Sequence, residues 1–374
     1  MRIHGVAIGV PLLSFARPDR SSRLWQALAD ANELSGLSPA SLSPAVNFVY
    51  RLYGWLRHRP SDRFGQVNLR PKVFDLRSDS VTSSILAASD PAFDVVLQEG
   101  FFFSPKSASK PYAVYIDATG SIVARHYPSQ CPWIADEGMR KNWLQRERSL
   151  YHEAIRVFCY SEFCRRSVIY DYGIPEDKVT TLYPGANRQA VNNENKREPK
   201  QVLFVGYDFD RKGGNKLLEA WPLVRRRVPE AELNIVGPEV GPSRCPAGVN
   251  FIGKVTNPAR LAELYASASV FCMPSLFEAY GHVFIEAMSA GLPCIGPSAF
   301  AAPEIIDAGK DGLLVQPGSV EEIADALIRI LSDQRLLQEM SHAARLKASS
   351  WPTWGEAAAS ISKQLNQDLV KATP

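Results

Sequence analysis

From residue 200 onward, short runs rich in valine, isoleucine and leucine alternate with stretches of amphipathic helical spacing, and glycine and proline mark the junctions. The runs predict strands at residues 202–205, 232–236, 250–252, 270–273, 293–295 and 313–315. The stretches between and after them predict helices at residues 217–228, 259–267, 282–290 and 323–330. Strands separated by helices indicate a parallel, doubly wound sheet, so this half of the chain is expected to form an α/β domain.

The N-terminal half alternates in the same way, with a weaker signal. Its pattern predicts strands at residues 3–10, 72–76, 94–98, 113–116 and 156–160, and a polar helix at 139–152. Between the halves lies a polar, asparagine-rich segment with almost nothing to bury, which favours an interdomain linker. We therefore predict an N-terminal domain at 1–186, a linker at 187–200, a C-terminal domain at 201–365 and a tail at 366–374.

The composition is that of an ordinary globular chain, with 45% hydrophobic and 22% charged residues. No apolar run approaches the roughly 18 residues that cross a bilayer, and a net charge of +3 is too small to indicate a nucleic-acid partner. The six cysteines form no CxxC pair, which favours buried free thiols and a cytoplasmic location. The apolar run at residues 3–13 could also be a signal peptide, but a first buried strand explains it equally well.

The predicted strand at 202–205 continues through a glycine-containing loop, residues 206–214, into a helix, and this loop carries Arg211 and Lys212. Its glycines let the backbone approach a ligand closely, and the start of the next helix offers free N–H groups and a positive dipole end. Ligands of doubly wound sheets bind at the carboxyl ends of the strands, where this loop lies. The pattern favours an anion site; a solvated turn with incidental charges is the alternative.

Two glutamates, Glu278 and Glu286, stand eight residues apart across a loop and the start of a predicted helix. A bound diphosphate would repel such carboxylates, so their useful role is to accept hydrogen bonds from the neutral hydroxyls of a sugar or a ribose. The alternative is a pair of surface glutamates that flank a buried strand end.

These glutamates form an E-x7-E motif within PSLFEAYGHVFIEAMSAGLPCIGP, which resembles the signature of the family-4 (group 1) retaining glycosyltransferases of the GT-B fold. Further segments are similar to that family in the same order, at residues 155–187, 210–224, 233–238, 251–275 and 303–319. The resemblance implies two Rossmann-like domains that face a cleft, of which the first binds the acceptor and the second the nucleotide sugar.

The resemblance also implies roles for individual residues. Arg211 and Lys212 would bind the donor diphosphate, Glu278 would contact the transferred sugar, and Glu286 would hold the ribose hydroxyls. The remaining donor contacts, which are backbone donors and a contact to the base, are implied for Tyr280, Gly281, His282 and Val255. Breaking a sugar–phosphate bond develops negative charge on the diphosphate, which a cationic clamp stabilises without a metal. Lys212 and Glu278 are therefore expected to be catalytic.

The first domain departs from the family pattern. Gly9-Val10-Pro11 replaces the Gly-Gly loop that often follows the first strand, and Asp117 stands where a histidine is common. We expect Asp117 at the carboxyl end of its strand, as a third catalytic residue facing the sugar; capping of the following turn is the alternative. His126, nine residues later, is the rival for that position. Tyr207 stands where the family customarily has an arginine, for which Arg211 could compensate.

Residues 45–59 have the spacing of a basic amphipathic helix with interfacial tryptophan and tyrosine. One face collects six apolar residues, which are Ala45, Phe48, Val49, Leu52, Trp55 and Leu56. Such a helix can lie on an anionic membrane, which would suit an enzyme that glycosylates a lipid-linked acceptor. Packing against the sheet of the first domain is the alternative.

We therefore expect a metal-independent, retaining glycosyltransferase of the hexosyltransferase type, with no cofactor besides its nucleotide-sugar substrate. It would move a sugar to a hydroxyl of a glycan or lipid-linked acceptor in the cell envelope, in the cytoplasm or at the inner face of the membrane. A nucleotide-sugar epimerase on the same fold and a non-catalytic nucleotide-sugar-binding protein are the alternatives. Acceptor-dependent transfer distinguishes the expected enzyme from both.

Overall fold

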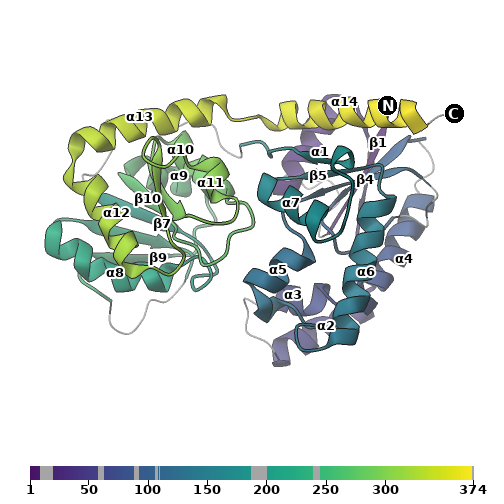
Figure 1. Ribbon diagram of the computed structural model, residues 1–374, viewed down its shortest axis with the longest axis horizontal. Helices are drawn as coiled ribbons and strands as arrows, with labels where there is room; N and C mark the ends of the chain where they lie inside the picture. Colours follow the sequence, from purple (N-terminus) through teal and green to yellow (C-terminus); the bar gives the residue numbers. More distant parts are fainter. Residues whose placement is uncertain are drawn as a thin grey trace. The chain divides into compact units, whose positions relative to one another are not determined.

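The computed structural model describes residues 1–8, 20–57, 63–87, 92–105, 108, 110–186, 200–238 and 245–372. They form two compact units, the first made of Met1–Gly185 and Pro352–Pro374 and the second of Ala186–Trp351 (Figure 1). The first division falls next to the predicted boundary at residue 186. Most of the predicted linker, residues 187–199, lies outside the described residues.

The first unit is built on a six-stranded parallel sheet in the order β2-β1-β3-β4-β5-β6. Its strands are β1 (Ile3–Ala7), β2 (Leu34–Pro39), β3 (Val95–Glu99), β4 (Tyr112–Ile116), β5 (Arg156–Cys159) and β6 (Val179–Thr181). Its helices are α1 (Arg20–Asp30), α2 (Pro44–Arg57), α3 (Arg63–Asn68), α4 (Pro71–Ala87), α5 (Gly120–His126), α6 (Glu137–Glu153), α7 (Glu162–Tyr170) and α14 (Trp354–Ala372), with 3₁₀ turns at Pro128–Gln130 and Glu176–Lys178. Strands β1 and β4 are buried along their whole length, as expected of parallel strands covered on both faces.

The strand predicted at residues 72–76 is wrong, because these residues lie inside helix α4. Pro71 occupies its first position, which tolerates proline, and the buried residues Arg77, Val81 and Ile85 recur at intervals of four. An apolar run of five residues does not distinguish a strand from part of a buried helix. The sequence pattern also does not predict β2 and β6, the two edge strands of this sheet.

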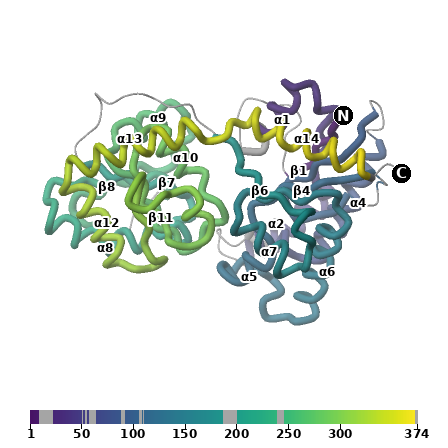
Figure 2. The backbone as a smooth tube through the Cα atoms, turned by 45° about the horizontal axis from the view of Figure 1, so that its top comes forward, coloured from purple at the N-terminus to yellow at the C-terminus, as the bar shows by residue number. Residues whose placement is uncertain are grey.

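The C-terminal helix α14 belongs to the first unit, where it lies beside α1 (Figures 1 and 2). Arg156 of β5 donates to both carboxylate oxygens of Asp368, at 2.7 and 2.6 Å. The predicted C-terminal domain at 201–365 and tail at 366–374 are therefore wrong at their ends, since the second unit stops at Trp351. An amphipathic pattern predicts that a helix covers a sheet, but not which of two sheets it covers.

The second unit has a parallel sheet in the order β12-β11-β10-β7-β8-β9. Its strands are β7 (Gln201–Val205), β8 (Glu232–Val236), β9 (Val249–Gly253), β10 (Val270–Cys272), β11 (Cys294–Pro297) and β12 (Gly312–Val315). Its helices are α8 (Gly214–Arg227), α9 (Pro258–Ser267), α10 (His282–Ser289), α11 (Ala302–Ile305), α12 (Val320–Ser332) and α13 (Gln334–Ser350). The six strands predicted for this half are present, and the four predicted helices correspond to α8, α9, α10 and α12.

Each sheet has a point where the strand order reverses. In the second unit the chain runs outward from β7 through β8 to β9 and then resumes on the other side at β10, so the reversal lies between β7 and β10. In the first unit it lies between β1 and β3. Loops at the carboxyl ends of the two strands diverge at such a point and leave room for a ligand. These two places are therefore where a binding site is expected.

Candidate functional site

Two loops of the second unit meet where its strand order reverses. One follows β7, from Gly206 to Gly213, and the other follows β10, from Met273 to Gly281. The backbone oxygen of Arg211 accepts hydrogen bonds from the amides of Leu276, at 2.8 Å, and Phe277, at 3.4 Å. These contacts fix the loops to one another, so the side chains that they carry converge.

Gly213 makes this close approach possible. Its φ is +78°, and a Cβ at this position would lie 2.0 Å from the carbonyl oxygen of Pro274. Both the backbone conformation and the lack of space therefore require glycine. The sequence pattern explains this glycine by the approach of a ligand, whereas the structure shows that it accommodates the neighbouring loop.

Lys212 and Glu278, 66 residues apart in the chain, form an ion pair between Nζ and Oε2. Their side chains are 12% and 8% exposed. Removal of either partner from so buried a pair leaves the other charge uncompensated, so each constrains the other. The structure thus brings together two of the residues predicted to be catalytic, from the loops on either side of the reversal.

The guanidinium group of Arg211 ties the same loops together. Its Nε donates to Oδ2 of Asp208 at 2.8 Å, and its Nη1 donates to the carbonyl oxygen of Phe277 at 3.0 Å. Arg211 therefore has a structural role that the sequence does not reveal; its binding of the diphosphate stays a prediction.

The helix α10 begins beside this ion pair. Tyr280, Gly281 and His282 are buried at its start, Gly281 has a φ of +102°, and the rings of Tyr280 and His282 lie 4.9 Å apart. The first N–H groups of a helix lack acceptors within the helix, so this end can donate to a ligand. The position of these residues fits their expected role as backbone hydrogen-bond donors. Their contact with the nucleotide sugar stays a prediction.

Glu286 and Val255 have different neighbours from Glu278. Glu286 lies on α10, where its Oε2 accepts a hydrogen bond from Tyr265 Oη at 3.4 Å. Val255 follows β9, and its carbonyl oxygen accepts a hydrogen bond at 3.3 Å from Oη of Tyr207. Tyr207 lies in the loop that follows β7. Tyr207, which replaces the expected arginine, therefore links two loops at the place assigned to the nucleotide.

A pocket of about 200 Å³ lies where the strand order of the first unit reverses. Its lining includes residues at the ends of four strands, which are Ala7, Ile8, Glu99, Gly100, Asp117 and Tyr160. Asp117 follows β4 directly, at the carboxyl end where it is expected. Two carboxylates, Glu99 and Asp117, make this lining negative, so it suits neutral hydroxyl groups better than a phosphate.

Glu99 and Tyr160 are candidate residues that sequence reasoning missed. Tyr160 Oη donates to Oε1 of Glu99 at 3.1 Å, and burial, with Glu99 as the next cause, raises the pKa of Tyr160 well above its ordinary value. Tyr160 therefore remains a neutral donor. One feature of the sequence could have identified Glu99: it follows a predicted buried strand directly, as Asp117 does.

The structure also places His126 and the turn after β4, the two alternatives to a reacting Asp117. His126 ends α5, at the far end of that helix from β4, and its ring lies 6.0 Å from that of Phe163. The N-cap of α5 is Thr119, whose hydroxyl accepts from the amide of Ile122 at 3.1 Å. Thr119 thus supplies the cap, and Asp117 rather than His126 lines the pocket.

A buried carboxylate, Glu147, holds the start of α5 behind Asp117. It accepts four hydrogen bonds, from Gly120 N (2.8 Å), Trp143 Nε1 (2.8 Å), Tyr151 Oη (2.7 Å) and Tyr172 Oη (2.6 Å). Burial raises the pKa of Glu147 to about 7, and the hydrogen bonds oppose that rise. Glu147 therefore positions the backbone three residues beyond Asp117.

The amphipathic helix predicted at residues 45–59 is present as α2, although residues 58–60 lie outside the described residues. Four residues of its predicted apolar face are 61–66% exposed, which are Phe48, Val49, Trp55 and Leu56. The helix packs on α3. The alternative that this face packs against its own sheet is therefore wrong; membrane contact stays a prediction.

The described ranges lack both a metal-binding cluster and a membrane-spanning helix. They hold no group of three or more His, Cys, Asp or Glu side chains arranged to bind a metal ion. None of their helices combines the length and apolar character needed to cross a membrane. The loop at residues 9–11, which departs from the family pattern, falls outside these ranges.

Known proteins resemble parts of this chain. Residues 187–347 match the family model described as "Glycosyl transferases group 1". The chain is 35% identical over 201 residues to a GDP-mannose-dependent alpha-(1-6)-phosphatidylinositol monomannoside mannosyltransferase of Mycobacterium tuberculosis, covering 50% of this chain and 52% of that protein. It is 35% identical over 170 residues to a phosphatidyl-myo-inositol mannosyltransferase of Mycobacterium leprae, covering 43% and 45%. The chain thus spans about half the length of these curated relatives.

The fold has solved counterparts. Sucrose-phosphate synthase from Thermosynechococcus elongatus matches with a TM-score of 0.71 over 100% of both chains, at 17% identity, which shows a common fold. Two units, each with a six-stranded parallel sheet, are the architecture expected of GT-B. The predicted fold is confirmed as GT-B, and the predicted resemblance to the group 1 glycosyltransferases is matched over residues 187–347.

Proposed function

We propose that this chain transfers a sugar, with retention of anomeric configuration, from a nucleotide diphosphate sugar to a hydroxyl of a glycolipid or glycan acceptor. The bond between the anomeric carbon and the diphosphate oxygen breaks, and a bond to the acceptor oxygen forms. The acceptor proton passes to the leaving diphosphate. The proposed reaction takes place on one face of the sugar and uses neither a metal ion nor a cofactor.

The contact between Lys212 and Glu278 carries this proposal. It joins a cation that can bind the leaving diphosphate to a carboxylate that can accept hydrogen bonds from the sugar, at the point where a doubly wound sheet binds its ligand. As the sugar–phosphate bond breaks, negative charge grows on the diphosphate, and a fixed cation stabilises it. Arg211 and the start of α10 supply further positive potential beside it.

Three observations support a lipid-linked acceptor. The pocket beside Asp117 is lined with carboxylates, which suit neutral sugar hydroxyls. The apolar face of α2 is exposed, so it can rest on a membrane surface. The two mycobacterial relatives are named for mannosyl transfer to phosphatidylinositol compounds, and one of them for the use of GDP-mannose.

A donor and acceptor screen tests the proposal. The chain would be incubated with GDP-, UDP- and ADP-sugars, starting with GDP-mannose, with and without vesicles that contain phosphatidylinositol or its mannosides. Release of nucleoside diphosphate that requires an acceptor, with a product of the donor's anomeric configuration by NMR, is the expected result. Isomerised donor without any acceptor would establish an epimerase instead. Donor binding without turnover under every condition would establish a non-catalytic binding protein.

A further inference from the structure

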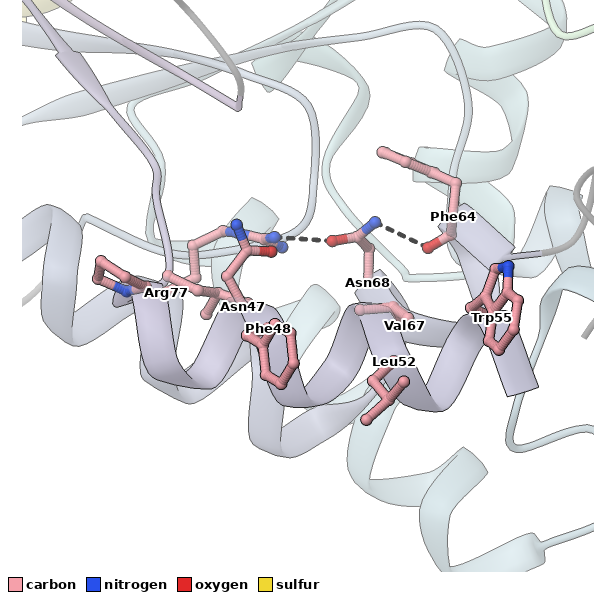
Figure 3. A pocket seen from close by; sticks show the side chains of 10 residues that line it. Asn47, Phe48, Leu52, Trp55, Phe64, Val67, Asn68 and Arg77 are labelled. Atoms are coloured by element: carbon pink, nitrogen blue, oxygen red, sulfur yellow. Dashed lines mark hydrogen bonds between the residues drawn. The ribbon is translucent and has the colours of Figure 1, made fainter. Parts of the chain in front are cut away.

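A second, larger hollow in the first unit is a groove between α2, α3 and the start of α4 (Figure 3). Its volume is about 720 Å³, within the usual range for small-molecule sites. The walls are largely apolar, and they include Phe48, Leu52, Trp55, Phe64 and Val67. Phe48 and Trp55 are 66% and 64% exposed, so these rings face the groove without cover from the protein.

A buried arginine, Arg77 of α4, lines this groove. It is 5% exposed, and its Nη2 donates to Oδ1 of Asn68 at 2.7 Å, as Figure 3 shows. Its Nε and Nη1 are buried and have no hydrogen-bond partner in the part of the chain that the structure describes. Burial lowers the pKa of Arg77 to about 10, which leaves it cationic at neutral pH. A buried cation with unused donors is costly, and an anion would relieve that cost.

The groove adjoins the pocket that contains Asp117. Phe64, which lines the groove, packs edge-to-face on Phe102 at 5.4 Å between ring centroids. Phe102 in turn lines the pocket with Asp117. Two neighbouring aromatic rings therefore lie between the two hollows, and an extended molecule that reached both would have to pass over them.

We propose that this groove binds the phosphate of a membrane lipid, which Arg77 holds while the hydrocarbon chains lie along Phe48, Leu52 and Trp55. The inference rests on the proposed function and deepens it: the lipid is the phosphate-bearing part of the acceptor, and its sugar hydroxyls reach the pocket of Asp117. The combination of one buried guanidinium with an apolar wall favours this ligand, because free phosphate would leave the wall uncovered and a neutral lipid would leave the donors unused.

Binding of a short-chain lipid tests this site without any membrane surface. The probes are dihexanoyl phosphatidic acid below its critical micelle concentration, dihexanoylglycerol and inorganic phosphate, titrated calorimetrically into the full chain without sugar donor. We expect phosphatidic acid to bind at least about tenfold more tightly than either other probe, since only it uses both the cation and the wall. Equal affinity for inorganic phosphate, or for dihexanoylglycerol, would overturn the inference.

Substitutions then locate the bound lipid. Arg77→Met should weaken binding of phosphatidic acid by about tenfold or more, because it removes the charge-assisted hydrogen bonds. Phe48→Asp should do the same from the exposed wall, where a change does not disturb the core. Val49→Asp is the matched control: it lies on the same helix at 61% exposure but lines a different hollow, so affinity should stay within about twofold.

Three outcomes would contradict the inference: unchanged affinity in Arg77→Met, unchanged affinity in Phe48→Asp, or an equal loss in Val49→Asp, which would place the lipid on the whole face of α2. Thermal unfolding verifies that each variant is folded. Turnover of nucleotide sugar in the donor and acceptor screen separates this inference from the proposed function. Donor turnover without lipid binding would overturn the inference alone, and lipid binding without donor turnover would overturn the proposed function alone.

Discussion

Both units bury a carboxylate close to their candidate site, and they stabilise it by different means. Glu147 of the first unit accepts hydrogen bonds from four uncharged donors, which lie on α5, on α6 and just after α7, and it is fully buried. Glu278 of the second unit forms an ion pair with Lys212, a residue of the neighbouring loop. The first arrangement fixes a backbone position, whereas the second holds a cation and an anion together where a charged substrate is expected to bind.

The kind of partner distinguishes a structural carboxylate, Glu147, from one that is expected to take part in the reaction, Glu278. Four donors satisfy the acceptor capacity of Glu147, so it has little left to offer a ligand. A diphosphate can compete with Glu278 for Lys212, and Glu278 can in turn accept hydrogen bonds from sugar hydroxyls. We therefore expect substitutions at Glu147 to act on stability and substitutions at Lys212 to act on both stability and donor affinity.

Lys212→Ala should have the largest effect. Glu278 would become a buried charge without its partner, which lowers the free energy of unfolding by about 3 kcal/mol. Loss of a charge-assisted hydrogen bond of about 1.5–3 kcal/mol should weaken nucleoside diphosphate binding ten- to a hundredfold. Urea unfolding measures the first effect and calorimetry the second. Lys216→Ala, which removes a partly exposed lysine of α8 that pairs with Glu219 on the same helix, is the control and should change neither by much.

A double variant separates the two effects of that change. Lys212→Met with Glu278→Gln removes both charges, so most of the lost stability should return while diphosphate binding stays weak. If binding returned together with stability, Lys212 would act only as a structural partner of Glu278, and the contrast between the units would disappear.

Glu147 gives the next largest effect, on the pH dependence of stability. Its pKa is about 7 in the folded chain, against 4.5 as the ordinary value, so the folded state holds the proton more tightly. The resulting stabilisation is complete below pH 4.5 and is lost as pH rises through 7. It amounts to about 3 kcal/mol in full. Urea unfolding of wild type and Glu147→Gln from pH 4.5 to 8 measures it as the difference between the two curves. Parallel curves would show that Glu147 does not titrate in this range.

The two units also differ in how far their sequences predict them. In the second unit, the glycines, the charges and Glu278 are clustered within two loops, so the strand pattern was enough to place them at one edge of a sheet. In the first unit, Glu147 and Gly120 are joined by a contact across 27 residues, and nothing in the local pattern marks either. Periodicity predicts elements and their ends, but it does not predict which distant polar groups satisfy one another.

Contacts between neighbouring loops are the other part that the sequence does not predict. Arg211 has the residue type and position of a diphosphate ligand, yet its guanidinium is held by Asp208 and by the carbonyl oxygen of Phe277. Secondary structure is limited in the same way at residues 72–76. Their apolar residues suit a strand or a helix, and only their packing within α4 makes them helical.

Asp117→Asn should lower the rate of transfer by at least about tenfold while donor binding is retained, because it removes a charge from the pocket of the first unit and leaves the loops of the second unit unchanged. His126→Ala is the comparison and should change the rate less, since His126 lies at the far end of α5. Initial rates with saturating donor, beside calorimetry with nucleoside diphosphate, provide both readings. If His126→Ala lowered the rate of transfer and Asp117→Asn did not, His126 and not Asp117 would be assigned as the reacting residue of the first unit.

Glu286→Gln gives the smallest expected effect. It tests whether Glu286 and Glu278 have different roles in binding the nucleotide sugar. A hydrogen bond from a ribose hydroxyl to an ionised carboxylate is stronger than one to an amide oxygen by about 1 kcal/mol. The affinity for nucleoside diphosphate alone should therefore fall about fivefold. Glu278→Gln should leave that affinity unchanged or raise it, because it removes a carboxylate that competes with the diphosphate for Lys212. Calorimetry with the nucleoside diphosphate measures both variants without any sugar present. The opposite ordering would mean that Glu278 holds the ribose and that Glu286 faces the transferred sugar.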